Sequence, residues 1–175
     1  MKQTLVSRPF LCVAATMLLW SGNGMSTDWP RQGTTNYVIH YVMQPITTID
    51  EGNLGKAVAL ELVGTTANLD GGMLMDKLVA HCIAVRIDSG SAKYMNGGCT
   101  MTDKDNDKIF TTFDTRELEG ALPKFTCGTH TITGGSGKYK GMTGKEPFNC
   151  NILPATQNAR WTGIDIEHQL TYRFE

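Results

Sequence analysis

Three features are missing from this chain: a cluster of basic residues, a C-x-x-C pair, and any apolar run of about 18 residues, the length needed to cross a bilayer. Without a basic cluster the chain is not expected to bind nucleic acid, whose phosphates need a patch of Lys and Arg. Without a C-x-x-C pair a four-cysteine zinc site is not expected. We also expect no membrane span in the mature protein.

Catalytic sequence motifs are also missing. A phosphate-binding loop needs G-x-x-x-x-G-K-[ST], and neither Gly137-Lys138 nor Gly144-Lys145 fits that spacing. A serine hydrolase of the nucleophile-elbow type needs G-x-S-x-G, which does not occur. We therefore expect no cofactor, and the sequence names no reaction.

The N-terminal segment is typical of a signal peptide. Lys2 and Arg8 give it a positive start, Phe10 to Trp20 form a short apolar core, and Gly24-Met25-Ser26 supply the small residues that a signal peptidase recognises. We expect residues 1–26 to be removed before Thr27. The mature protein would then be secreted or periplasmic, with residues 27–175 forming a single domain.

Four cysteines remain after cleavage, an even number that favours disulfides in an exported chain. Four cysteines allow three pairings. The strand pattern favours Cys82 with Cys99 and Cys127 with Cys150, because each pair then lies across one hairpin.

The mature sequence consists of short runs rich in β-branched and aromatic residues, each closed by Gly, Asn or Asp, with no long amphipathic helix. Such a pattern indicates an all-β fold, either an eight-stranded antiparallel barrel or a sandwich. A barrel is favoured, because closure removes exposed edges and pairs the long first and last strands. The predicted strands are residues 36–44, 56–64, 73–87, 92–102, 108–115, 125–133, 138–149 and 159–174.

Alternation with a period of two predicts which side chains face the core. In the last strand the predicted inward set is Ile164, Ile166, His168, Leu170, Tyr172 and Phe174. The same test places Val58, Leu60 and Leu62 on one face of the second strand. It places Val79, His81, Ile83, Val85 and Ile87 on one face of the third, which we also expect to point inward.

Each of the four histidines shares a face with apolar neighbours: His40, His81, His130 and His168. If those faces line one lumen, several imidazoles converge in a desolvated cavity, where acid-base roles become possible. The alternative is four separate histidines with their own hydrogen bonds. The sequence does not decide between them, because convergence depends on strand order.

Two segments invite a metal interpretation. The acids of Asp103 to Lys108 could supply calcium ligands, but an EF-hand loop needs Gly at its sixth position, where Lys108 stands. A solvated hairpin turn accounts better for these residues. The methionines could suggest copper, but only Met73 and Met75 lie close together, and core filling explains the rest. We expect no metal site.

The stretch Thr133 to Gly144, TGGSGKYKGMTG, combines dense glycine with a single aromatic residue, as a tight hairpin of a coiled sheet requires. With its GG[ST]G segment at Gly134 to Gly137, the following Lys138-Tyr139, and further glycines, the chain resembles the allene oxide cyclase and dirigent barrel superfamily. The stretch Cys99 to Phe113 is similar to one in exported bacterial members. The resemblance covers roughly residues 79–174.

This resemblance implies an eight-stranded antiparallel barrel with an apolar lumen. In plants such barrels fold a reactive lipid epoxide or orient phenolic radicals by shape. The catalytic carboxylates of the plant enzymes match no acid of this chain, so the resemblance implies the fold and not an activity.

Three functions follow as hypotheses. The first is non-enzymatic binding of a small apolar ligand in the lumen. The second is a shape-directed cyclase or isomerase, with His81 and His168 as acid-base groups and Glu61 as a weaker candidate. The third is a structural or adhesive module with a filled barrel, which would carry an extended apolar patch on its outer face. The predicted ligand-binding residues are Tyr41, His81, Val85, His168 and Tyr172.

Overall fold

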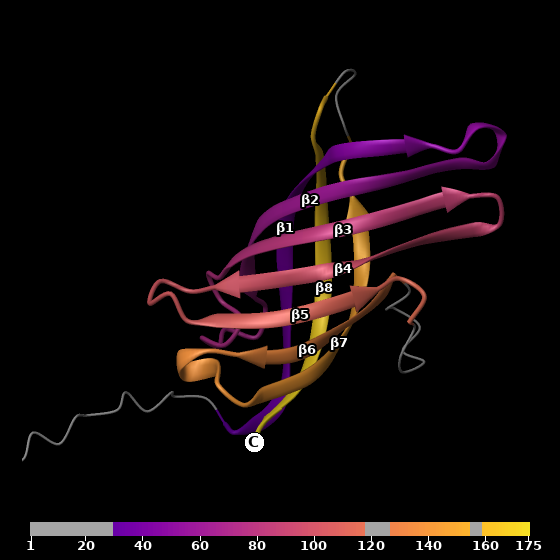
Figure 1. The fold of residues 1–175 in the computed structure, drawn as a ribbon. Coiled ribbons are helices and arrows are strands. Elements are labelled where there is room, and N and C mark those ends of the chain that lie inside the picture. Colours follow the sequence, from indigo (N-terminus) through magenta and orange to yellow (C-terminus); the bar gives the residue numbers. More distant parts are fainter. Residues whose placement is uncertain (1–29, 118–126, 155–158) are drawn as a thin grey trace, which may run out of the picture.

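The computed structural model describes residues 30–117, 127–154 and 159–175. Eight strands form one closed barrel in which each strand pairs antiparallel with the next and β8 pairs with β1 (Figure 1). The strands are β1 Gln32–Asp50, β2 Gly55–Asn68, β3 Val79–Ser89, β4 Ala92–Thr102, β5 Lys108–Asp114, β6 Gly128–Gly135, β7 Met142–Ile152 and β8 Thr162–Phe174. Short 3-10 turns lie at Gly52–Leu54 and Gly137–Tyr139.

The predicted fold class, an eight-stranded antiparallel barrel, is confirmed.

The third strand begins later than predicted, at Val79 instead of Met73. Met75 and Lys77 adopt positive φ, which interrupts an extended strand. The segment before β3 instead places Leu74, Met75 and Leu78 in the hydrophobic core. These side chains close the end of the barrel where β2 finishes.

The opposite end is built differently. There β1 and β2 run on as a hairpin, and β3 and β4 extend beside them (Figure 1). The residues of β1 from Gln44 to Asp50 are mostly exposed, and burial in β3 declines after Ala84. The four strands therefore project beyond the closed part of the barrel, and this end has no buried apolar segment of the 74–78 kind among the described residues.

The inward faces of β2 and β8 are as predicted. Val58, Leu60 and Leu62 are buried, and in β8 the alternate residues from Ile164 to Tyr172 are buried while their neighbours are not.

The predicted inward face of β3 is wrong. Val79, Ile83 and Val85 are 52%, 50% and 42% exposed, and His81 lies with them on the outside. The lumen side of β3 carries Ala80, Cys82 and Ala84 instead, all buried. The reason is volume: large rings from other strands fill the lumen, so this wall has room only for small side chains, and the larger aliphatic residues face outward.

Both predicted disulfides are present. Cys82 and Cys99 face each other across β3 and β4 with a Cα–Cα distance of 4.1 Å, and Cys127 and Cys150 are joined with a Cα–Cα distance of 5.8 Å. Cys82 and Cys99 are both buried, so this bridge lines the lumen. Two disulfides are typical of a protein that folds in an oxidising compartment.

The acidic stretch after β4 forms a tight turn. The Asp103 side chain accepts hydrogen bonds from the backbone N–H groups of Asp105 and Asp107, and the Lys138 ammonium pairs with Asp103 and Asp105. The turn is thereby tied to the glycine-rich hairpin between β6 and β7. No cluster of three or more His, Cys, Asp or Glu side chains arranged to hold a metal occurs among residues 30–117, 127–154 and 159–175.

The expected signal peptide at 1–26 and its cleavage before Thr27 lie outside the described residues. Within the part of the chain that the structure describes, no helix combines the length and apolar character needed to cross a bilayer.

Candidate functional site in the barrel lumen

A group of polar side chains lies in the middle of the apolar lumen. Tyr37 of β1, His130 of β6, Glu146 of β7 and His168 of β8 are at most 2% exposed. Strand register brings them together, because Tyr37 is paired with His168 and His130 with Glu146. We call these four residues the lumen cluster.

The lumen cluster is closely packed. The Tyr37 hydroxyl donates a hydrogen bond of 2.6 Å to Glu146 Oε2, and its ring stacks on the His168 imidazole with 4.6 Å between centroids. His168 Nδ1 lies 3.7 Å from the same carboxylate oxygen, and the two imidazoles lie 5.1 Å apart, edge to face. His130 Nδ1 is 3.0 Å from the Thr111 hydroxyl.

Three polar atoms of the lumen cluster have no hydrogen-bond partner. They are Glu146 Oε1 and the two ring nitrogens of His168, all buried. A buried polar atom without a partner costs about 1–3 kcal/mol, so native proteins keep few of them. Three such atoms on two adjacent side chains therefore call for a functional explanation.

Burial changes the protonation of the lumen cluster. It raises the pKa of Glu146 to about 7, although the hydrogen bond from Tyr37 opposes the change. It lowers the pKa of His130 to about 3. It also holds the pKa of His168 well below the usual range, with a smaller contribution from His130. Near neutral pH the two imidazoles are therefore uncharged, and Glu146 is close to the midpoint of its titration.

Aromatic rings surround the two histidines. Phe113 of β5 stacks on His130 with 4.9 Å between centroids, and Phe148 of β7 meets His130 at 5.1 Å, edge to face. Gly97 on β4 makes room for this packing, because a Cβ there would lie 2.9 Å from Phe113 Cε1. The buried disulfide also lines the lumen, and its Cys82 Sγ lies 3.1 Å from the Tyr41 hydroxyl.

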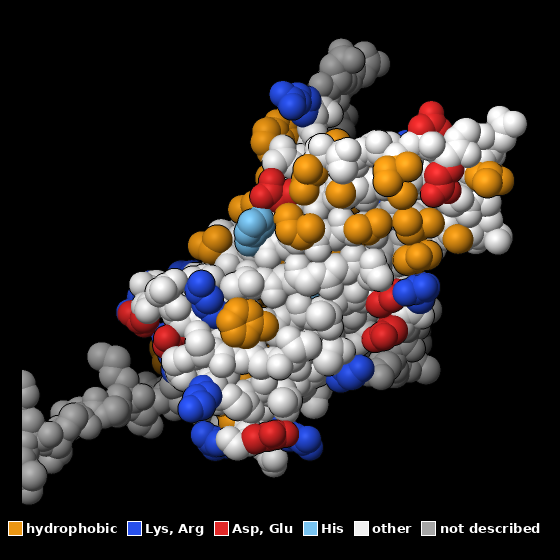
Figure 2. All heavy atoms as spheres, in the orientation of Figure 1, with side chains coloured by type: hydrophobic (Ala, Val, Ile, Leu, Met, Phe, Trp, Pro, Cys, Tyr) orange, Lys and Arg blue, Asp and Glu red, His pale blue; other side chains and the backbone are white. Residues whose placement is uncertain are grey.

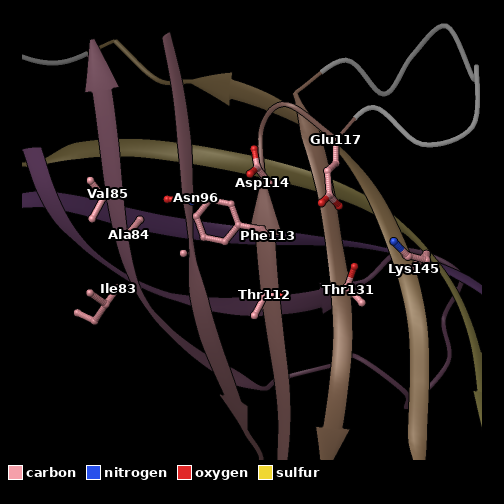
Figure 3. Close-up of a pocket in the computed structure, with 11 residues that line it drawn as sticks. Ile83, Ala84, Val85, Asn96, Thr112, Phe113, Asp114, Glu117, Thr131 and Lys145 are labelled. Atoms are coloured by element: carbon pink, nitrogen blue, oxygen red, sulfur yellow. The ribbon is translucent and has the colours of Figure 1, made fainter. Parts of the chain in front are cut away.

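Phe113 also borders a groove of about 540 Å³ that crosses the strands β3 to β7. Figure 3 shows its ring reaching from β5 toward β4, with Thr112, Thr131 and Lys145 further along the groove. Phe113 is thus shared by the groove and the aromatic shell of the lumen cluster.

The structure separates the residues predicted to form the site. Tyr41, His168 and Tyr172 are buried on the lumen side. His81 and Val85 are not in the lumen, because the other face of β3, with Ala80, Cys82 and Ala84, points inward.

The weaker catalytic candidate, Glu61, is likewise outside the lumen. Its Oε1 lies 2.8 Å from His81 Nε2, and its Oε2 accepts a hydrogen bond from Gln44. His40 also lies on the outer surface, with Nδ1 2.8 Å from Asp165 Oδ1. Two histidines therefore converge in the lumen and two do not.

Sequence reasoning missed Tyr37 and Glu146. A signal for Glu146 was present, because a period of two places it on the same strand face as Met142 and Phe148. An isolated glutamate on an inward face is a marked departure from the usual composition of a core.

The outer face carries an apolar surface over neighbouring strands. Figure 2 shows hydrophobic side chains gathered over the β2 and β3 part of the face in view. The residues that are 42–52% exposed on β1 to β3 are Val42, Val63, Val79, Ile83 and Val85. An apolar patch of this kind is the feature expected of an assembly module.

The fold and site define a closed antiparallel β-barrel with a buried acid–imidazole cluster. No model of a known protein family matches the chain, and no curated protein matches it in sequence. Among solved structures, the chain is similar to a pterocarpan synthase dirigent protein, with 10% sequence identity and a TM-score of 0.48. The match covers 85% of this chain and 90% of that one.

Proposed function

We propose that this exported barrel binds a small, mostly apolar molecule in its lumen and that Glu146 and His168 hydrogen-bond the polar group of that molecule. The supporting observation is the set of three buried atoms without partners in the lumen cluster. A carbonyl or hydroxyl group placed among them would satisfy a donor or an acceptor that the described protein groups leave unsatisfied.

The surroundings of the lumen cluster suit such a molecule. Phe113, Phe148 and Tyr37 offer aromatic faces, and the inner face of β3 carries the small side chains Ala80 and Ala84. Pockets for small molecules are usually apolar with a few placed polar groups. The rings are closely packed, so a ligand binds by moving them aside, and it reaches them from the end that Leu74 and Met75 do not close.

A matched pair of variants tests the proposal. Ala84 points into the lumen, whereas Ile83 points outward on the same strand. Wild type, Ala84→Leu and Ile83→Leu would be incubated with a lipid extract and examined by native mass spectrometry, with a melting curve to confirm folding. We expect wild type and Ile83→Leu to carry a bound small molecule and Ala84→Leu to lose it.

The His168→Phe variant then tests the polar contact, because it keeps an aromatic ring and removes both nitrogens. We expect it to bind the identified molecule roughly tenfold more weakly. If no extract gives a bound molecule with the folded wild-type protein, the lumen is filled by side chains alone and the proposal is wrong.

A second candidate function is a shape-directed isomerase or cyclase. One observation favours it: Glu146, with a pKa near 7, stands beside the neutral imidazole of His168. A carboxyl group of that pKa can both give and accept a proton at neutral pH. The test is to incubate lipid epoxides and phenolic radicals with wild type and Glu146→Gln and to analyse products by chiral chromatography. An enzyme would give one enantiomer in excess with wild type alone.

A further inference from the structure

Arg86 is a cation on the inner face of the barrel near its projecting end. It follows Ala80, Cys82 and Ala84 at a period of two, and the register of β3 with β2 and β4 is unbroken there. Its cross-strand neighbours are Val58, which is buried, and Met95, which packs against the core. The Arg86 side chain therefore lies between two apolar side chains in its row.

Arg86 has no partner among the described residues. Its Nε is buried and makes no hydrogen bond, and no ion pair or ring contact involves the side chain anywhere in the described structure. Arginine donors that are removed from water are normally paired with an acceptor, because an unpaired charged donor is costly. Arg86 as a whole is only partly buried, so its guanidinium group is open to a ligand.

The other charged groups on this inner face balance one another. Register places Asp50, Lys56, Asp88 and Lys93 in a single row, one step further toward the tip than Arg86. Lys93 Nζ lies 3.7 Å from Asp88 Oδ1. The charges of the two aspartates and the two lysines in this row cancel. The positive charge of Arg86 therefore remains uncompensated on this face.

On the other side of Arg86, toward the closed end, the part of the next row that lies on β2 to β5 is apolar and contains Leu60, Ala84, Gly97 and Phe113. The same row continues on β6 and β7 with His130 and Glu146 of the lumen cluster. A ligand lying along the lumen would thus meet a cation at the projecting end, then apolar side chains, and then the polar atoms of Glu146 and His168.

We propose that Arg86 binds an oxyanion of the lumen ligand, so that the ligand is an amphiphile with a carboxylate or sulfonate-like head and an apolar body. This inference rests on the proposed binding of a small apolar molecule in the lumen. The planar guanidinium suits such a head because it can donate two parallel hydrogen bonds to two oxygens. The head stays at the projecting end, and only the body reaches the desolvated lumen cluster.

Two fluorescent probes with the same ring system test this inference. Anilinonaphthalene sulfonate carries a sulfonate, and N-phenylnaphthylamine lacks it. Both would be titrated into wild type, Arg86→Gln, Arg86→Lys and Arg173→Gln. The last is a matched control, because Arg173 has a 70% exposed side chain on the outside of β8 near the closed end.

We expect wild type to bind the sulfonate probe at least about tenfold more tightly than the neutral one. Arg86→Gln should lose this preference while its affinity for the neutral probe changes less than about twofold. Arg86→Lys should keep part of this preference, since lysine keeps the positive charge but cannot donate two parallel hydrogen bonds. Arg173→Gln should behave as wild type.

Other outcomes overturn the inference in distinguishable ways. If wild type binds both probes equally, or if Arg86→Gln leaves sulfonate binding unchanged, no anion site exists at Arg86, while lumen binding of the neutral probe still stands. If Arg86→Gln weakens both probes by the same factor, Arg86 supports the fold and does not bind the head. If neither probe binds the folded wild-type protein, the proposed function fails as well.

Discussion

The Tyr37 hydroxyl reaches across the lumen from β1 to β7 and donates a 2.6 Å hydrogen bond to Glu146, a residue 109 positions away in the sequence. Among the described residues, this is the one hydrogen bond to the Glu146 carboxyl group, which aromatic rings and neutral imidazoles otherwise surround. It opposes the rise in the Glu146 pKa caused by burial. Loss of the bond should therefore be visible in both stability and protonation.

Tyr37→Phe should lower the free energy of unfolding by about 1–3 kcal/mol, because it removes one partner of a buried hydrogen bond. It should also raise the pKa of Glu146 further, since the hydrogen bond from Tyr37 lowers it. Denaturant unfolding measures the first effect, and NMR of labelled glutamate carboxyl carbons measures the second. Tyr94→Phe is the control: Tyr94 lies on the outer side of β4 under Arg116, and its loss of a hydroxyl should change stability by less than about 0.5 kcal/mol.

The stability of the protein should depend on pH through the lumen cluster. His130 and His168 have pKa values below those of the unfolded chain, so the unfolded state binds more protons below about pH 6.5 and acid destabilises the fold. Glu146 acts in the opposite direction between about pH 4.5 and 7, because its folded pKa is raised. The two effects balance at about pH 7, so stability should be greatest there.

The Glu146→Gln variant separates these contributions. Without the carboxyl group, stability should fall more steeply on acidification from pH 6.5 to 4.5, by roughly 1.4 kcal/mol for each pH unit. Between about pH 6.5 and 7.5, where the histidine and Glu146 contributions nearly cancel in wild type, the variant should instead gain stability as the pH rises. Urea unfolding at several pH values measures both slopes, and parallel profiles for wild type and variant would contradict the assigned role of Glu146.

Substitutions on the two faces of the barrel wall should differ sharply in cost. Leu60 is 3% exposed, and Leu60→Ala should destabilise the protein by about 2–5 kcal/mol through the cavity it leaves. Ile83 is 50% exposed, and Ile83→Ala should cost about 1 kcal/mol or less. Equal losses in thermal unfolding would mean that Ile83 is covered in solution.

The two disulfides should contribute unequally. They close loops of similar size, with sequence separations of 17 and 23, so restriction of the unfolded chain is worth about 3 kcal/mol for each. Cys82 and Cys99 are also buried in the lumen against Tyr41. The double variant Cys82→Ala, Cys99→Ala should therefore lose more stability than Cys127→Ala, Cys150→Ala. A greater loss for the second pair would show that the partly buried bridge contributes more than the fully buried one.

The sequence predicts the barrel well because strands and turns leave local signals. The eight strands, both disulfides and the inward faces of β2 and β8 follow from alternation, glycine positions and cysteine spacing. The face of β3 could not be predicted in this way. Both of its faces are apolar, and the choice between Ala84 and Val85 depends on how much space the rings of other strands leave in the lumen.

The lumen cluster is harder still to foresee from sequence. Tyr37, His130, Glu146 and His168 come from four strands, and their convergence depends on closure of the barrel and on shear between strands. His130 and His168 were visible as inward histidines, but His40 and His81 gave the same pattern and lie outside. Only three-dimensional register separates the two pairs.

Closure by β1 and β8 also orders the folding of the chain. Gln32 pairs with Arg173 and Met43 with Thr162, so the seam joins segments that are among the most distant in the described sequence. Such contacts carry a high entropic cost and form late, whereas the β3–β4 hairpin with Cys82 and Cys99 can form early. Until β8 docks, β1 and β7 each expose an unpaired edge that can recruit another chain. The last strand therefore governs whether the newly made protein closes on itself or aggregates.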